Sequence, residues 1–465
     1  MTDKPREACG VFGIYAPGED VARISYFAIY TLQHRGQESA GIATGDGQRI
    51  SVYARMGLVA QVFNEEVLAG LRGKVAIGHN RYSTTGSSKQ INVQPMLAEG
   101  PLGAIAVGHN GNLVNAGQLR REMLAEGHVF STTSDTEQIA KLFAFSPGYT
   151  WVERIRAAML RMRGAYSLVA MTRDALFAVR DPWGVRPLAI GNLKGRWVVA
   201  SESCALDTIG AEFVRDVEPG EIVQIDENGL HSQVGLPAAR HSLCIFEFIY
   251  FARPDSIIEG RLLYSAREEM GRQLAREHPV EADIVIGVPD SATAAGIGYA
   301  RQSGIPFTEG LIKSRYIGRT FIQPEQNLRE MGINLKFNAM PGVLAGKRVI
   351  VVDDSIVRGT TTRPLVRLIR KAGAREVHVR ISSPPYGHPC VLGVDTARRK
   401  ELIAARMSVP EIERYIEANS LGYLSREGLL QAIALPSKHF CQACFTGSYP
   451  MPVEVEVDKL ALERA

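Results

Sequence analysis

The sequence predicts two parts of different fold class, a layered α+β part followed by a doubly wound, parallel α/β part. Short β-rich runs alternate with helical segments in the first half, and turns such as the one at 218–221 separate them. The second half has strand-like runs at 283–288, 349–352 and 376–381, with helical segments between them. The run at 349–352 is apolar without a polar break, which is typical of a strand buried on both faces of a parallel sheet. A length of 465 residues also favours two or three domains.

Individual elements follow from the same patterns, taken in chain order. In the first half, strand-like runs lie at 10–14, 75–78, 105–108, 167–171 and 197–200, and a helix opens at 134–137. In the second half, the clearest helix follows the run at 349–352. Leu365, Leu368 and Ile369 repeat there with helical spacing, with Pro364 in the first turn and Gly373 near the end. The character of the chain changes near residue 240, so we divide it into 9–240 and 241–465.

The composition is that of a globular chain. Hydrophobic residues make up 45% and charged residues 22%, and a net charge of +4 is too small to favour nucleic acid as a partner. No apolar stretch approaches the roughly 18 residues of a membrane span, and the first residues contain no apolar signal core. We therefore expect a cytoplasmic protein without a membrane partner. Disulfides are rare in that compartment, so the six cysteines are expected to serve catalysis or metal binding.

The most informative stretch lies at 347–362, where an apolar run leads into an acidic pair and then into a loop of small and hydroxylic residues. Asp353 and Asp354 end the run, and Ser355, Gly359 and three consecutive threonines follow before the helix. Main-chain N–H groups and hydroxyls at a helix start bind phosphate. Carboxylates beside a phosphate are better explained by sugar hydroxyls, by Mg2+ or by both. The alternative is an ordinary strand-to-helix turn with two aspartate caps.

From 349 to 361 this stretch resembles the phosphoribosyl pyrophosphate (PRPP) loop of the phosphoribosyltransferases. The resemblance implies PRPP contacts from Asp353, Asp354, Ser355, Arg358, Gly359, Thr360 and Thr361. A second loop, with Asp290 and Ser291, is expected to face the pyrophosphate, since ligands bind beyond the carboxyl ends of parallel strands. One Mg2+ per subunit would be held by Ser291, Asp353 and Asp354. Arg319, in a basic segment, is expected to close on the pyrophosphate; a solvated basic loop is the alternative.

Cys9 precedes a strand-like run and would become the first residue if residues 1–8 were removed as a propeptide. A free α-amino group, with a pKa of about 7.7–8.0, can then take the thiol proton. With the polar clusters at 33–38, 79–84, 109–112 and 134–137, this arrangement resembles the N-terminal-nucleophile (Ntn) glutamine amidotransferases, which have a four-layer fold. An unprocessed chain, with this amine blocked, is expected not to hydrolyse glutamine.

The same resemblance gives each polar cluster a role in binding and hydrolysing glutamine. The thiol would attack the side-chain amide, and Asn110 and Gly111 would form the oxyanion hole. Arg81 would bind the α-carboxylate and Asp135 the α-ammonium group, with Arg35 as a supporting contact in the same pocket. Each residue also has an ordinary alternative: a small buried thiol, a turn, or a helix N-cap.

Together the halves resemble the glutamine-dependent PRPP amidotransferases over almost the whole chain, including a block at 241–256. The resemblance implies that ammonia from glutamine attacks C1 of PRPP through a dry path, giving 5-phosphoribosylamine, pyrophosphate and glutamate in purine synthesis. The segment 82–94 would be the lid over glutamine. A homodimer or homotetramer inhibited by purine nucleotides is also implied. Glucosamine-6-phosphate synthase and asparagine synthetase carry similar glutamine domains, and a PRPP-sensing regulator is a further alternative.

Four cysteines from three segments remain for a cofactor: Cys244, Cys390, Cys441 and Cys444. One branch of the resembled family carries a 4Fe-4S cluster, and the local contexts of the four cysteines match it. This implies one cluster per subunit, with a structural or oxygen-sensitive role. Zinc or free thiols are the alternatives. Cys204 has no partner left and is expected to be a core thiol.

Overall fold

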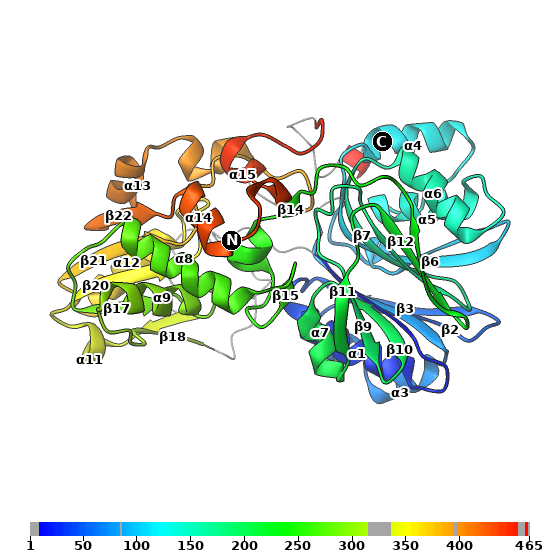
Figure 1. Ribbon diagram of the computed structural model, residues 1–465, viewed down its shortest axis with the longest axis horizontal. Helices are drawn as coiled ribbons and strands as arrows, with labels where there is room; N and C mark the ends of the chain where they lie inside the picture. The colour runs from blue at the N-terminus through cyan, green and yellow to red at the C-terminus, as the bar shows by residue number, and fades with distance from the viewer. Residues whose placement is uncertain (1–8, 84–85, 315–335, 395–397, 454–460, 464–465) are drawn as a thin grey trace.

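The computed structural model describes residues 9–83, 86–314, 336–394, 398–453 and 461–463, and it divides into two halves (Figure 1). Two antiparallel sheets form the centre of the first half. A seven-stranded sheet has the order β11-β9-β10-β1-β4-β2-β3, and a six-stranded sheet has the order β13-β12-β8-β7-β6-β5. The strands of the first sheet are β1 (Gly10–Tyr15), β2 (Ser39–Gly45), β3 (Ile50–Met56), β4 (Val75–Arg81), β9 (Ala189–Leu193), β10 (Arg196–Ala200) and β11 (Glu212–Asp216). Those of the second are β5 (Met96–Gly100), β6 (Gly103–Leu113), β7 (Gly164–Met171), β8 (Leu176–Arg180), β12 (Glu221–Asp226) and β13 (Gly229–Val234).

Side chains of the two sheets interlock between them, and helices cover both outer faces. Val75 and Ile77 on β4 share one buried core with Val169 and Met171 on β7. The other face of the seven-stranded sheet packs against α1 (Val21–Thr31), α2 (Val59–Val62), α3 (Glu65–Gly70) and α7 (Ser203–Ile209). The six-stranded sheet packs against α4 (Ala116–Ala125), α5 (Asp135–Phe145) and α6 (Trp151–Arg161). The four-layer arrangement predicted for this half is therefore confirmed.

The second half is built on a parallel sheet with the order β17-β20-β21-β22. Its strands are β17 (Ile284–Gly287), β20 (Arg348–Asp353), β21 (Glu376–Ile381) and β22 (Ser420–Tyr423). On β20, Ile350 and Val352 enter the core with α8 (Leu263–Glu277), α9 (Thr293–Ser303) and α14 (Arg426–Ile433). Val349 and Val351 enter the opposite core with α12 (Thr362–Lys371) and α13 (Val409–Ile416). Because both faces are buried, the apolar run is continuous, and the doubly wound prediction is confirmed.

Short elements lie at the junction of the two halves and in the rest of the second half. At the junction are β14 (Leu243–Cys244), the π-helix Glu247–Phe251, β15 (Ile257–Ile258) and β16 (Arg261–Leu262). Farther along the chain are β18 (Leu311–Lys313), β19 (Phe337–Ala339), α11 (Pro341–Leu344), β23 (Phe440–Cys441) and α15 (Ala443–Thr446). Near the end of the chain, Leu462 packs into the core below α4–α6, so the last described residues lie on the first half, although the sequence division places them in the second. Within the described part of the chain, no helix combines the length and apolar character needed to cross a bilayer.

Candidate active sites

Cys9 lies directly before β1, in the middle of the seven-stranded sheet, and only 5% of its surface is exposed. Its Sγ donates to the carbonyl oxygen of Tyr82 and accepts from the main-chain N–H of the same residue, each at 3.3 Å. Burial raises the pKa of this thiol to about 11. At neutral pH the sulfur is therefore protonated, and it needs a base before it can act as a nucleophile.

A small cavity of about 10 Å³ opens beside Cys9, with room for about one water molecule. It is lined by Cys9, Arg81, Tyr82, Gln94, His109, Gly111, Ser134 and Asp135. Four residues predicted from separate stretches of the sequence are thus brought to one place. The described residues leave a volume that is too small for glutamine.

Asn110 and Gly111 lie on β6, opposite Ser167 and Tyr166 of β7. Gly111 has a φ of +153°, and a Cβ atom there would lie 2.0 Å from the carbonyl oxygen of Ala165, so the strand pairing requires glycine. The Asn110 side chain is fully buried, and within the described residues its Oδ1 and Nδ2 have no hydrogen-bond partner. A buried amide is costly to leave unpaired. Its free N–H group suits an oxyanion that forms only during a reaction.

Arg81 and Asp135 bring opposite charges to the cavity. Burial lowers the pKa of Arg81, whose Nη1 lies 3.8 Å from Oε2 of Glu38 and donates to the carbonyl oxygen of Ser87 at 3.1 Å. Asp135 begins α5 and accepts from the N–H of Leu113 at 3.0 Å. Burial alone would raise its pKa, but the nearby His109, the Leu113 N–H and Arg81 together lower it. The cavity thus holds one cation and one anion, which match the two ends of an amino acid.

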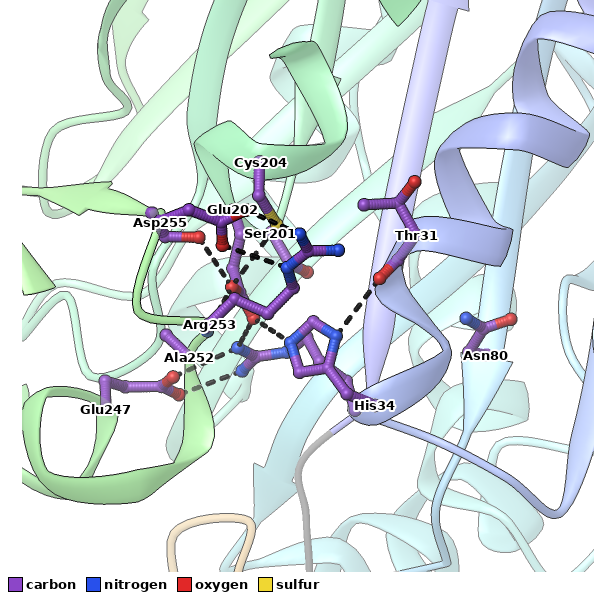
Figure 2. A network of polar contacts seen from close by, with 12 residues as sticks. Thr31, His34, Asn80, Ser201, Glu202, Cys204, Glu247, Ala252, Arg253 and Asp255 are labelled. Carbon is purple, nitrogen blue, oxygen red and sulfur yellow. Dashed lines mark hydrogen bonds and ion pairs between the residues drawn. The ribbon is translucent and has the colours of Figure 1, made fainter. Parts of the chain in front are cut away.

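Arg35 lies behind the nucleophile, where the two halves of the chain meet. Its Nε donates to the carbonyl oxygen of Cys9 at 3.1 Å, and its other nitrogens contact Glu202 and Glu247 at 2.5–3.0 Å. Figure 2 shows Glu202 and Glu247 in this network, with His34 contacting both Glu202 and Thr31. Arg35 is not among the residues that line the cavity, and it contacts the main chain of Cys9 instead; its supporting contact with glutamine stays a prediction.

In the second half, the two loops predicted to bind PRPP leave neighbouring strands, β20 and β17, at the same edge of the sheet. Asp354 is 1% exposed, and its carboxylate accepts from the hydroxyls of Ser291 at 2.6 Å and Ser355 at 2.7 Å. Asp353 accepts from the N–H of Asp354 at 2.9 Å. Asp290 is largely exposed and pairs with Lys313. The Asp354 carboxylate and the hydroxyls of Ser291 and Ser355 therefore lie together, next to Asp353, and such oxygen atoms are the ligands that Mg2+ takes in proteins.

The rest of the PRPP loop leads into the first turn of α12. Arg358 Nε contacts Glu401 at 3.3 Å, and Gly359 adopts a φ of +75°, a left-handed conformation that favours glycine. Thr360 is exposed, and the carbonyl oxygen of Thr361 accepts from the N–H of Leu365 at the start of the helix. Arg319 lies outside the described residues.

Cys244, Cys390, Cys441 and Cys444 converge where the halves join. Cys244 and Cys441 are directly paired in the parallel β14–β23 ladder, and none of the four forms a disulfide. Burial raises the pKa of Cys444 well above its usual value, and the other three sulfurs raise it further. Among the described residues, no group of three or more His, Cys, Asp or Glu side chains has the spacing that holds a single metal ion. Cys204 lies in the core below α7, as predicted.

Comparisons with known proteins match both halves. A glutamine amidotransferase domain model matches residues 79–208, and a phosphoribosyl transferase domain model matches residues 255–382. The chain is 53% identical to the amidophosphoribosyltransferase of Synechococcus elongatus, covering 99% of this chain and 95% of the relative. It is 48% identical to that of Bacillus subtilis, covering 96% and 95%. The chain belongs to the amidophosphoribosyltransferase family.

Solved structures agree with this membership of the amidophosphoribosyltransferase family. An allosteric regulatory enzyme of purine biosynthesis matches with a TM-score of 0.92 and 48% identity, covering 98% of each chain. The Bacillus subtilis glutamine PRPP amidotransferase, solved with ADP and GMP, matches with a TM-score of 0.91 and 47% identity, covering 98% of this chain and all of that one. The chain is therefore a glutamine-dependent phosphoribosyltransferase of purine biosynthesis.

Several residues of these sites carried no assigned role in the sequence. Glu38 and His109 belong to the polar clusters at 33–38 and 109–112, so the sequence could have indicated that they lie at the glutamine site. Glu247 stands in the block at 241–256 that resembles the family, but nothing in the sequence links it or Glu202 to Arg35, from which they lie 212 and 167 residues along the chain. Only the folded structure brings them together.

Proposed function

We propose that this member of the amidophosphoribosyltransferase family hydrolyses glutamine at Cys9 and passes the ammonia to C1 of PRPP, giving 5-phosphoribosylamine, pyrophosphate and glutamate. The observation that carries the proposal is the shared cavity of Cys9, Arg81 and Asp135 beside the unpartnered amide of Asn110. A thiol, two opposite charges and an oxyanion donor are what hydrolysis of an amino-acid amide requires.

Before glutamine can be hydrolysed, residues 1–8, which lie outside the described residues, must be removed from the chain. The freed α-amino group takes the proton of the Cys9 thiol, whose pKa of about 11 keeps it from ionising unaided. The thiolate attacks the amide carbon of glutamine, and the oxyanion is stabilised by the Asn110 side chain and the Gly111 N–H. The C–N bond then breaks, the leaving nitrogen takes the proton back from the α-ammonium group of Cys9, and ammonia is released. Water hydrolyses the resulting thioester to glutamate and the free thiol. Arg81 and Asp135 hold the α-carboxylate and α-ammonium group. Glutamine does not fit a cavity that holds about one water, so the predicted lid at 82–94, of which 84–85 lie outside the described residues, is expected to move when glutamine enters.

PRPP binds across the carboxyl edge of the parallel sheet. The ribose hydroxyls lie against Asp353 and Asp354, and the 5-phosphate lies on the loop from Ser355 to Thr361, with Gly359 allowing its close approach. Ser291, Asp353 and Asp354 fit one Mg2+, which would supply positive charge for the departing pyrophosphate. Asp290, Arg358 and Arg319 complete the proposed contacts. Positioning of PRPP and neutralisation of charge are expected to account for most of the catalysis, since C1 becomes cationic as pyrophosphate leaves.

The second half of the chain also fits a 4Fe-4S cluster held by Cys244, Cys390, Cys441 and Cys444. The four thiols are buried or half-buried and mutually close, and a cubane is larger than one ion and takes ligands that stand farther apart. When bound, the cluster would join the tail of the chain to the junction between the halves. Purified protein is expected to be brown, with iron and sulfide in about equal amount. A colourless, zinc-loaded protein would contradict the assignment.

Three further assignments follow from the family. The Bacillus subtilis relative was solved with ADP and GMP, and we propose that purine nucleotides also bind this chain and inhibit it. A homodimer or homotetramer and a cytoplasmic location remain predictions from the sequence. Ultracentrifugation with and without nucleotide tests the assembly.

Intact-mass measurement combined with assays of glutamate and pyrophosphate release tests the proposed function. Chains that begin at Cys9 are expected to release both products when glutamine and PRPP are present. Chains that keep residues 1–8 are expected to use ammonia but not glutamine, because their amine is blocked. Full glutamine-dependent activity in a chain whose mass includes residues 1–8 would contradict the proposal.

A further inference from the structure

The segment 391–393 of the second half runs along the end of β6 in the first half. The Asn112 side-chain Nδ2 donates to the carbonyl oxygen of Val391 at 3.0 Å, and Arg186 donates to that of Leu392 at 3.0 Å. Val391 and Leu392 are buried in one small core with Ala165. Hydrogen bonds from the first half therefore fix two successive carbonyl groups of this segment.

At Gly393 the segment reaches the backbone of the oxyanion hole itself. A Cβ atom at Gly393 would lie 2.9 Å from both the Cα and the carbonyl carbon of Gly111, closer than such atoms pack in proteins. Gly393 also has a φ of +99°. Since Gly111 in turn leaves no room for a side chain against Ala165, its backbone has close neighbours from both halves.

We infer that the segment 391–393 sets the position of Asn110 and Gly111 for glutamine hydrolysis, with Gly393 and Asn112 as positioning residues; this rests on the proposed function. Oxyanion stabilisation depends on donors placed to within a fraction of an ångström. Gly393 lies against the backbone of Gly111 itself, and Asn112 is the next residue on β6. The glutamine site of the first half is thus completed by main-chain atoms of the second half.

The Gly393→Ala variant tests this directly. Its added methyl displaces Gly111, so kcat for glutamine hydrolysis is expected to fall about tenfold or more, while KM for glutamine stays within about twofold because Arg81 and Asp135 are untouched. An aldehyde analogue of glutamine, which forms a tetrahedral adduct with a thiol, should bind about tenfold more weakly. Activity with ammonia and PRPP is expected to be retained. The Gly229→Ala control has a similar φ of +103° and nothing within 4 Å of the new methyl group. Its kcat and KM for glutamine hydrolysis should therefore match those of wild type.

Asn112→Ala provides a second route if Gly393→Ala does not fold. It removes the hydrogen-bond donor to the carbonyl oxygen of Val391 and should also lower kcat for glutamine hydrolysis, with less effect on KM for glutamine. The inference is overturned if kcat and analogue binding are unchanged in the folded variants. It is also overturned if KM for glutamine rises and the ammonia reaction falls together with kcat. A wild-type protein that never hydrolyses glutamine at Cys9 would instead refute the proposed function.

Discussion

His79 is a buried imidazole on β4 whose protonation the fold opposes. Its Nε2 donates to the carbonyl oxygen of His109 at 3.0 Å, and within the described residues its Nδ1 has no partner. Burial lowers the pKa of His79 to about 3, against 6.5 in an unfolded chain. Between these values the unfolded state binds a proton that the folded state does not, so stability falls as the pH drops.

The variant His79→Gln should reduce this loss of stability in acid. In wild type, each pH unit below 6.5 costs up to about 1.4 kcal/mol at this group. The variant is expected to be less stable than wild type near neutral pH but to lose less on acidification. Urea midpoints at about pH 7.5 and about pH 5 measure the difference. The surface variant His231→Gln is the control. If the urea midpoint falls equally between the two pH values in His79→Gln, in His231→Gln and in wild type, His79 is not the source of the loss of stability in acid.

At the scale of elements, β20, the PRPP loop and α12 form the unit that the sequence predicts best. The alternation of Val349 and Val351 against Ile350 and Val352 fills two cores at once, which explains an apolar run without polar breaks. The acidic pair lies at the carboxyl end of the strand, the edge of a parallel sheet where ligands bind, and both side chains are buried there. This unit was predictable because strand, loop and helix are contiguous and each follows local rules.

The variant Asp354→Asn tests that unit. The carboxylate that accepts from Ser291 and Ser355 loses its charge, so kcat/KM for PRPP should fall about hundredfold or more with either glutamine or ammonia as nitrogen source. Glutamine hydrolysis without PRPP should not change. Asp283→Asn, at the opposite end of the same sheet, is the matched control. If only the glutamine-dependent reaction is lost, Asp354 does not serve the PRPP site.

At the scale of the whole molecule, buried charges join the halves. Glu247 is fully buried, and its carboxylate accepts from Arg35 of the first half at 2.9–3.0 Å and from Arg186 at 3.2 Å. Arg267 on α8 donates to the carbonyl oxygens of Phe248 and Ala252, and burial lowers its pKa to about 10 although Asp354 nearby raises it. Buried charges thus lie between the main chain at Cys9 and the PRPP loop, with Glu247 bonded to Arg35 and Arg267 near enough to Asp354 to feel its charge.

Glu247→Ala should destabilise the protein strongly, because it leaves Arg35 and Arg186 buried without this partner. A loss of about 3–5 kcal/mol in the free energy of unfolding is expected. Glu65→Ala, which removes an exposed ion pair with Arg23, should leave stability almost unchanged. Urea denaturation followed by circular dichroism compares the variants. Similar small effects from both would show that the buried network contributes little.

Long-range arrangement is the part that could not be predicted. Arg81, Asn110, Gly111 and Asp135 could be predicted because each stands in a recognisable local cluster, and Cys9 because it would become the first residue once residues 1–8 are removed. The pairing of β1 with β10, the role of Arg35 and the contact of Gly393 with Gly111 join segments far apart in the chain. No local pattern encodes such contacts, because they depend on how whole sheets and halves pack.

The central claim is that the nitrogen released at Cys9 reaches PRPP without passing through bulk solvent. The direct measurement supplies glutamine labelled with 15N in its amide, PRPP and an excess of unlabelled ammonium, and follows the 15N content of the 5-phosphoribosylamine formed. The 5-phosphoribosylamine is expected to carry mainly 15N from the glutamine amide. A product whose label matches the diluted ammonium pool would contradict it.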